Sequence, residues 1–201
     1  PLLKILSQMG DGSQYDNKTF IERGLEVYAK NGFTTVIEGG ATPPQVETFR
    51  QLARDQRLAQ DVIALQFFET SSVDEVKQQF SKSYSNRFRV GGGKVVLDGG
   101  SPGRTAYLRE PYHTPTHGQP TEYRGYPTIK EQSALNQLID SYYQADTPIY
   151  VHALGDAAVD MSIEAIKFAE ANITTPHDKR TQLIHAQQVQ PDQFSILKDL
   201  D

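Results

Sequence analysis

The chain contains no cysteine among its 201 residues. This absence excludes a disulfide framework and a zinc site built from thiolates. Any metal ion bound by this protein must therefore be held by nitrogen and oxygen ligands.

Long apolar runs and concentrated basic charge are also missing. No segment approaches the roughly 18 to 20 apolar residues of a membrane span, and the first residues lack the charged, apolar and small-residue order of a signal peptide. The formal net charge is −5 and no basic cluster occurs, which argues against nucleic acid and against an anionic membrane as partners. We expect a cytoplasmic location, and we expect that Pro1 and Asp201 are not natural ends, since the last residues have the pattern of a helix.

Hydrophobic residues make up 37% of the chain and charged residues 22%, which is ordinary for one globular domain spanning residues 1–201. Strand and helix signals alternate along nearly the whole length, and this alternation predicts an α/β fold with parallel strands. Strands are expected at residues 33–38 and 61–67, and helices at residues 17–31 and 157–171. A further helix is expected to begin at Thr42. Two more are expected to begin at the capping boxes Ser72–Glu75 and Thr128–Glu131.

Three potential metal ligands each end a short run rich in β-branched residues: Lys94, His152 and His185. His152 follows Lys94 by 58 positions and His185 follows His152 by 33, the second interval being close to one βαβ step. Parallel strands deliver the side chains at their carboxyl ends into one shared mouth. The spacing therefore predicts that these three side chains converge.

The interval between Lys94 and His152 holds a long segment, residues 98–127, that is rich in Gly, Pro, Thr, Tyr and His and lacks apolar periodicity. We interpret it as a loop at the mouth of the site, since binding residues concentrate on such loops. Arg104, Tyr112 and His117 are its candidates for substrate contact, with a solvated surface loop as the alternative.

Each candidate has a purely structural alternative. A lysine at a strand end can extend its ammonium group to solvent, and single histidines are often hydrogen-bonded core residues. Asp98 and Asp156 can bond loop backbone or cap a helix, or they can support the metal ligands. The glycines at 91–93 and 99–103 complete no phosphate-binding pattern, which argues against nucleotide binding.

The residues from 94 to 106, 110 to 112, 152 to 160 and 185 to 187 together resemble the amidohydrolase family 3 group of the amidohydrolase superfamily. That group includes enzymes similar to N-substituted formamide deformylase and proteins labelled exoenzyme regulatory proteins. The resemblance extends from about residue 33 to the end. It implies a partial (β/α)₈ TIM barrel of the metal-dependent hydrolase type, covering about strands two to six.

By this resemblance, Lys94 is similar to the lysine that becomes N-carboxylated and bridges two metal ions, and His152 and His185 to ligands on strands five and six. The implied cofactor is a divalent metal, zinc being favoured by imidazole nitrogen. The implied reaction is hydrolysis of a non-peptide carbon–nitrogen bond in a small amide or formamide by an activated water. Two positions depart from the family pattern: Ala157 replaces an arginine and Ile184 replaces a glutamate.

The His-x-His pair and the late aspartate of the family have no counterpart in the sequence. We therefore expect these 201 residues to be an internal, inactive piece of an enzyme. The alternative is a non-catalytic barrel that acts as a regulatory or ligand-binding protein. A partial barrel exposes strand edges, so self-association is also expected.

Overall fold

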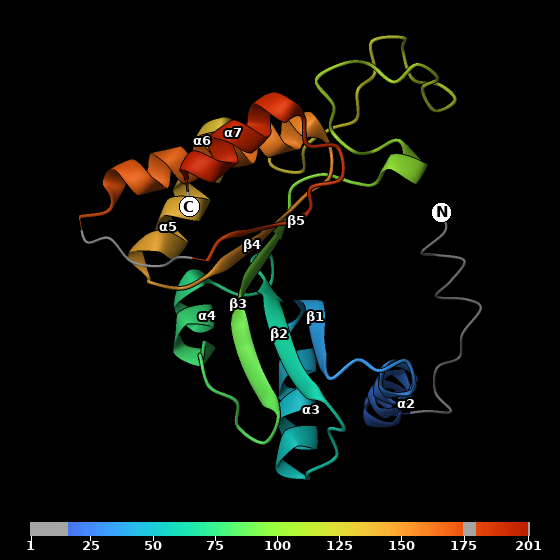
Figure 1. Ribbon diagram of the computed structural model, residues 1–201, viewed down its shortest axis with the longest axis vertical. Coiled ribbons are helices and arrows are strands. Elements are labelled where there is room, and N and C mark those ends of the chain that lie inside the picture. Colours follow the sequence, from blue (N-terminus) through green and yellow to red (C-terminus); the bar gives the residue numbers. More distant parts are fainter. Residues whose placement is uncertain (1–15, 175–179, 201) are drawn as a thin grey trace.

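The computed structural model describes residues 16–174 and 180–200. Five parallel strands lie in the spatial order β1-β2-β3-β4-β5 (Figure 1). They are β1 (Thr35–Ala41), β2 (Asp61–Phe67), β3 (Phe88–Val96), β4 (Ile149–Ala153) and β5 (Gln182–His185). The sheet curls into a half-barrel, which confirms the expected partial barrel with parallel strands.

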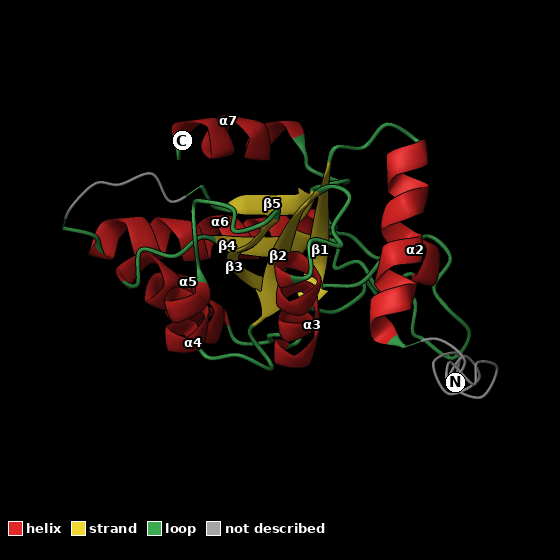
Figure 2. Cartoon of the chain, turned by 90° about the horizontal axis from the view of Figure 1, so that it is seen from below, coloured by secondary structure: helices red, strands yellow, loops and turns green. Residues whose placement is uncertain are grey.

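Helices alternate with the strands along the chain and surround the curled sheet (Figure 2). They are α2 (Asn17–Lys30), α3 (Pro43–Arg54), α4 (Val73–Gln79), α5 (Gln132–Gln144), α6 (Asp156–Asn172) and α7 (Pro191–Asp199), with a short 3₁₀ turn η2 (Ser101–Gly103). No helix in the described part of the chain is long and apolar enough to cross a membrane.

Two apolar clusters pack the outer face of the sheet against the helices. One joins β3 and β4 to α5 and α6 and includes Val95, Val151, Ile139 and Ile163. The other joins β2 to α2 and α3, with Val62 among its members. Alternation along each strand sends every second residue to the opposite, concave face.

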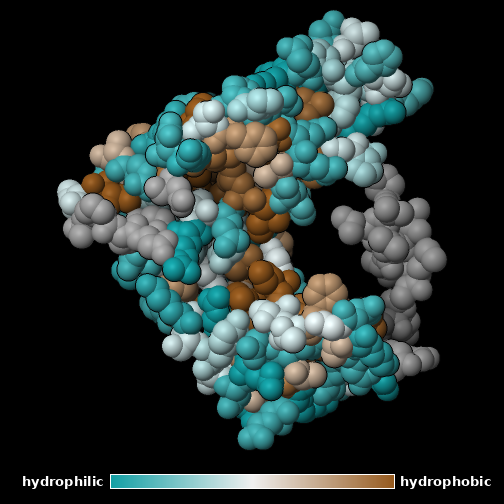
Figure 3. All heavy atoms as spheres, in the orientation of Figure 1, coloured by the Kyte–Doolittle hydropathy of each residue, from teal (hydrophilic) through white to brown (hydrophobic). Residues whose placement is uncertain are grey.

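The concave face carries a smaller cluster of Ile63, Leu65 and Tyr150, with Ile184 packed against it. Figure 3 shows apolar surface gathered over the middle of the molecule, where the strands lie in Figure 1. At the edge strand β1, Ile37 is 53% exposed, although its register partner on β2 is Ile63. The sheet therefore has a partly open apolar inner face.

The capping box at Ser72 is confirmed, because Glu75 N donates to Ser72 Oγ at 3.3 Å and Ser72 N donates to Glu75 Oε2 at 2.7 Å. The one expected at Thr128–Glu131 is wrong. Glu131 is the N-cap of α5, and the Thr128 hydroxyl donates to the carbonyl oxygen of Val96 at 2.5 Å. Because this hydroxyl holds the end of the long loop against β3, it is not available to cap a helix.

The first strand begins two residues later than expected. Phe33 precedes β1, its backbone N–H donates to Tyr28 O at 3.1 Å, and its ring lies edge-on to the Tyr28 ring at 5.5 Å. The aromatic residue therefore closes the end of α2 instead of extending the strand. The helix expected at residues 157–171 is α6, Asp156–Asn172.

Gly92 sets a bulge in β3 just before Lys94. The pairing of β2 with β3 shifts between Ala64 and Leu65, and Gly92 has φ +144°, a conformation that side chains rarely adopt. A Cβ atom there would overlap the carbonyl oxygen of Pro148, which accepts a hydrogen bond from Gly93 N at 2.9 Å. The glycine run is therefore a strand-packing feature.

Candidate metal centre

Lys94 lies in the C-terminal half of β3, with only 4% of the residue exposed. It is in register with Phe67 on β2 and with Tyr150 on β4. Its ammonium group makes no hydrogen bond or ion pair with another residue in the described ranges. Burial disfavours the charged ammonium form and lowers the pKa of Lys94 from 10.5 to about 8.

His152 follows on the neighbouring strand, where it is in register with Val96, two residues beyond Lys94. Residues two apart on a strand share a face, and so do register partners in a parallel sheet. Lys94 and His152 therefore lie on the same concave side of the sheet. The imidazole Nε2 lies 3.1 Å from the carbonyl oxygen of Gly99, to which it donates when it carries the proton.

His185 ends β5, and strand alternation alone would send it to the outer face. Its neighbour Ile184 is in register with His152 and packs into the concave cluster, so the next residue in an extended strand would point the other way. The backbone instead turns left-handed, with φ +75° at His185 and +44° at Ala186. This turn re-aims the imidazole, a strained feature of the kind that collects at functional sites.

The two imidazole rings meet at the carboxyl ends of their strands. The ring centroids of His152 and His185 lie 4.5 Å apart at an interplanar angle of 74°. Desolvation of the ring, and then the positive charges of His152 and Lys94, lower the pKa of His185, while the negative charge of Asp98 acts in the opposite direction. Lys94, His152, His185 and Asp98 thus share one electrostatic environment.

Asp98 is fully buried and lies two residues after the end of β3. Its carboxylate accepts hydrogen bonds from the backbone N–H groups of Tyr107 at 2.9 Å, Leu154 at 2.9 Å and Gly155 at 2.8 Å. Its Oδ1 also lies 3.4 Å from Nε2 of His152. One carboxylate therefore joins the long loop, the end of β4 and the start of α6 beside the histidine pair.

Of the three loop residues expected to contact substrate, two make contacts within the loop and one is exposed. Arg104 donates from Nη1 to Pro115 O at 3.1 Å, and the Tyr112 hydroxyl donates to Ala106 O at 3.0 Å. The Tyr112 ring stacks on Tyr123 with a centroid distance of 6.0 Å, whereas His117 is exposed. No contact among the described residues joins Arg104, Tyr112 or His117 to Lys94 or to the histidine pair, so substrate binding by them stays a prediction.

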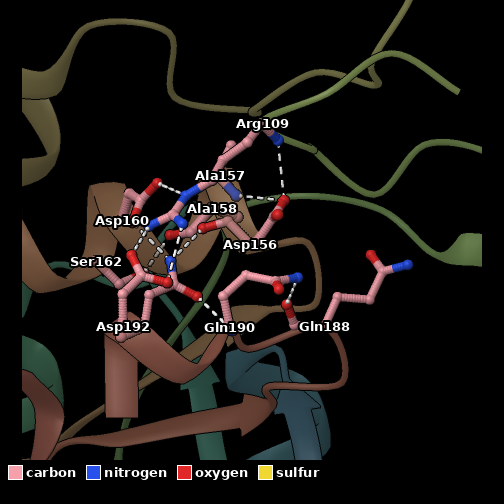
Figure 4. Close-up of polar contacts among 10 residues, drawn as sticks. Arg109, Asp156, Ala157, Ala158, Asp160, Ser162, Gln188, Gln190 and Asp192 are labelled. Carbon is pink, nitrogen blue, oxygen red and sulfur yellow. Dashed lines mark hydrogen bonds and ion pairs between the residues drawn. The ribbon is translucent and has the colours of Figure 1, made fainter. Parts of the chain in front are cut away.

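Arg109 anchors the long loop to two helices (Figure 4). Its Nε and Nη2 donate to the Asp160 carboxylate of α6 at 2.7 and 2.6 Å, and Nη1 and Nη2 donate to Asp192 of α7 at 3.2 and 2.9 Å. Asp156 accepts from Arg109 N at 2.9 Å. The fully buried Gln193 donates to Asp160 Oδ1 at 2.6 Å and to Asp156 O at 2.7 Å.

Sequence reasoning did not identify this Arg109 network. Asp156 and Asp160 lie four positions apart, which places both on one face of α6, but the sequence does not show which cation they meet. The structure places Asp156 in this anchor and shows no hydrogen bond from it to Lys94 or the histidines within the described residues. Its expected support of the metal ligands stays a prediction.

The cluster fits part of a metal site. Two adjacent imidazoles supply nitrogen donors, and a buried lysine with a lowered pKa can be neutral near pH 8. Yet within residues 16–174 and 180–200 no three His, Cys, Asp or Glu side chains form a group that could hold a metal ion. The three side chains predicted as ligands therefore share one region, and their role as metal ligands stays a prediction.

Comparison with known proteins agrees with this geometry. The profile described as "Amidohydrolase family" matches residues 4–201. The chain belongs to the amidohydrolase family. A search of curated proteins found no match.

Two solved structures are similar to this member of the amidohydrolase family. One is an uncharacterized metal-dependent hydrolase from Pyrococcus furiosus, with 26% identity and a TM-score of 0.72 over 91% of this chain and 36% of that chain. The other, an uncharacterized metal-dependent hydrolase from Pyrococcus horikoshii OT3, has 21% identity and a TM-score of 0.72 over 91% of this chain and 35% of that chain. The chain thus spans about a third of the length of each.

Two residues, Ala157 and Ile184, depart from the amidohydrolase family pattern. Ala157 is buried at the start of α6, and its N–H donates to Asp156 Oδ1 at 3.0 Å. Ile184 packs against Ile63, Leu65 and Tyr150 on the concave face. A polar side chain at position 184 would need partners that this apolar cluster does not offer.

Proposed function

We propose that the protein containing this chain is a metal-dependent hydrolase that cleaves a non-peptide carbon–nitrogen bond in a small amide or formamide. The observation that carries the proposal is the convergence of Lys94, His152 and His185 at the carboxyl ends of three consecutive parallel strands. Active sites of barrel enzymes lie at that end of the sheet. The family assignment and the metal-dependent hydrolases of similar fold support the same conclusion.

In this proposal, His152 and His185 are nitrogen ligands of a divalent ion, zinc being the best match to imidazole. When bound, divalent ions supply Lewis-acid polarisation of a carbonyl group and a water nucleophile at neutral pH. Asp98 holds the end of β3 and the start of α6 in place, so the position of His152 relative to β3 is fixed before a metal binds.

Lys94 has a separate role in the proposal, as the amine that takes up carbon dioxide. Its nitrogen must be neutral to form a bond to the carbon of CO₂, and burial supplies that form by lowering the pKa to about 8. The new carbamate carries two oxygens and a negative charge, and the proton of the amine leaves to solvent. The buried position of Lys94, in register with Phe67 and Tyr150, thus favours the chemistry required of a ligand lysine.

We further propose that the 201 residues alone are inactive. The sequence contains five histidines, and no two of them form a His-x-His pair. Two imidazoles and one lysine fall short of the ligands that a binuclear site requires. The same observation supports the second candidate function, a barrel that binds a ligand or partner without catalysis.

Metal analysis of the complete protein tests the proposal. Purified wild type, Lys94→Met, and a control variant of an exposed lysine on α6, Lys167→Met, are compared for bound zinc and for hydrolysis of a panel of N-acyl and N-formyl compounds. We expect stoichiometric zinc and activity in wild type and control, and loss of most activity and of part of the metal in Lys94→Met. A complete protein that binds no divalent metal would contradict the enzyme proposal and favour the binding role.

A further inference from the structure

The connection from β5 to α7, residues 186–190, runs alongside the end of β4. Ala186 N donates to Ala153 O at 3.1 Å, and Gln188 N donates to Leu154 O at 3.1 Å. These two backbone hydrogen bonds hold the first part of the connection against the neighbouring strand. They lie directly after the histidine that ends β5.

The start of this connection has a strained backbone. His185 and Ala186 are both left-handed, with φ values of +75° and +44°, and residues with a side chain adopt this conformation only at a cost in energy. Such a turn persists where the surrounding structure fixes the chain on both sides of it. The turn at His185 therefore requires that the later part of the connection is held in place as well.

Gln193 ties the beginning of α7 to α6. The residue is fully buried in the first turn of α7. Its Nε2 donates to Asp160 Oδ1 at 2.6 Å and to Asp156 O at 2.7 Å. Apolar residues of α7, such as Ile196 and Leu197, also pack against the core, but apolar contacts have no preferred direction. The hydrogen bonds of Gln193 therefore set the position of α7 along α6.

The same side chain also reaches the connection. Its Oε1 accepts a hydrogen bond from Gln190 N at 2.9 Å, and Gln190 Nε2 donates to Gln188 O at 3.2 Å (Figure 4). Gln188 is in turn bonded to β4 through its own N–H. A continuous chain of hydrogen bonds thus runs from α6 through Gln193 and Gln190 to the strand that carries His152.

We propose that Gln193 is a positioning residue for His185. It holds the later part of the connection in place, and it thereby keeps the left-handed turn that brings the His185 ring to 4.5 Å from the ring of His152. It acts through the backbone, because its own hydrogen bonds go to α6 and to the residue before α7. The consequence for metal binding rests on the proposed function, in which both imidazoles are ligands, whereas the ring geometry does not.

Nuclear Overhauser effects between the two imidazole rings test the positioning role. They are measured on the complete protein, metal-free and labelled with ¹³C-histidine, and are assigned with His152→Asn and His185→Asn. Gln193→Met keeps a side chain of similar size but removes all three hydrogen bonds of the amide group. We expect a ring-to-ring effect in wild type and its loss in Gln193→Met, because the relaxed turn no longer directs His185 toward His152.

Gln60→Met is the matched control for loss of a buried amide group. Gln60 is 3% exposed and donates from Nε2 to Leu25 O at 2.9 Å and to Phe33 O at 3.3 Å, before β2. We expect this variant to keep the ring-to-ring effect. An unchanged effect in Gln193→Met, its absence from folded wild type, or its equal loss in Gln60→Met would overturn the proposal.

Zinc titration of the same proteins extends the test to metal binding. We expect a Kd weakened about tenfold or more in Gln193→Met, as for other residues that orient a metal ligand, and a Kd close to that of wild type in Gln60→Met. Equal zinc affinity of wild type and Gln193→Met would overturn the positioning role and leave the hydrolase proposal intact. A complete protein that binds no zinc, but in which Gln193→Met abolishes the ring-to-ring effect, would contradict the hydrolase proposal and support the positioning role.

Discussion

At the residue scale, the burial that suits Lys94 to its proposed chemical role also destabilises the folded protein. The residue is 4% exposed, and its ammonium group has no hydrogen-bond or ion-pair partner within the described ranges. Burying an ammonium without a partner destabilises the folded state, as functional groups often do. The lowered pKa of Lys94 is the measurable sign of this cost.

Replacing Lys94 with methionine is therefore expected to stabilise the metal-free protein at pH 7, by on the order of 2 kcal/mol. The folded pKa, about 8, lies below the ordinary 10.5, so wild type regains stability as pH rises from 8 to 10.5, while the variant does not. The difference in free energy of unfolding between Lys94→Met and wild type should therefore decrease between pH 8 and pH 10.5. Urea unfolding of both proteins in the presence of a chelator, at pH 7 and pH 10, measures it. A less stable Lys94→Met at pH 7 would mean that the ammonium has a partner.

At the scale of elements, the Arg109 network holds together three segments that are far apart in sequence. The long loop, α6 and α7 contribute Arg109, Asp160 and Asp192 respectively. Hydrogen bonds to Asp160 and then to Asp192 raise the pKa of the guanidinium. Because α7 follows the strand that carries His185, this anchor also limits where the end of β5 can lie.

Arg109→Gln is expected to lower the free energy of unfolding by about 1 to 2 kcal/mol, since charge-assisted bonds to two carboxylates are lost but the groups are partly exposed. Arg109→Lys should not restore it, because lysine lacks the fork. A double-mutant cycle with Asp192→Asn measures the coupling between the two side chains. Additive effects would show that this pair contributes nothing beyond its separate residues.

The same pair has a defined pH dependence. Hydrogen bonding to Arg109 is the first cause that lowers the pKa of the Asp192 carboxyl below its usual 3.8. A lowered folded pKa gives stability that is present above 3.8 and is lost as pH falls through the folded pKa. The coupling energy from the cycle should accordingly be full at pH 6 and decrease below about pH 4.

At the scale of the whole molecule, the half-barrel has two free strand edges among the described strands, β1 and β5. Ile37 on β1 is 53% exposed beside the concave apolar face. Exposed strand edges and apolar patches favour pairing with another chain. We therefore propose that these 201 residues self-associate in isolation.

Sedimentation over a range of concentrations measures this association. Wild type is expected to sediment as species larger than a monomer, and Ile37→Lys to shift toward the monomer, because a lysine at a strand edge opposes pairing. Val27→Lys is the control, since Val27 is 60% exposed but belongs to α2 and not to a strand. A wild type that remains a monomer at every concentration would contradict the proposal.

The sequence alone predicted the order of strands and helices and the three side chains at the strand ends. These follow from local rules: apolar periodicity, caps such as Ser72, and the near-constant length of a βαβ step. It also located the long loop from its lack of periodicity. It misplaced the cap at Thr128, because the partner of that hydroxyl lies 32 residues earlier, at Val96.

Only the tertiary structure decided how the site is assembled. The left-handed turn at His185, the three amide donors gathered by Asp98 and the meeting of Arg109 with two helices all depend on segments brought together by the curled sheet. Periodicity in a sequence reports the face on which a side chain lies, whereas contacts between distant segments depend on how the strands twist and pack.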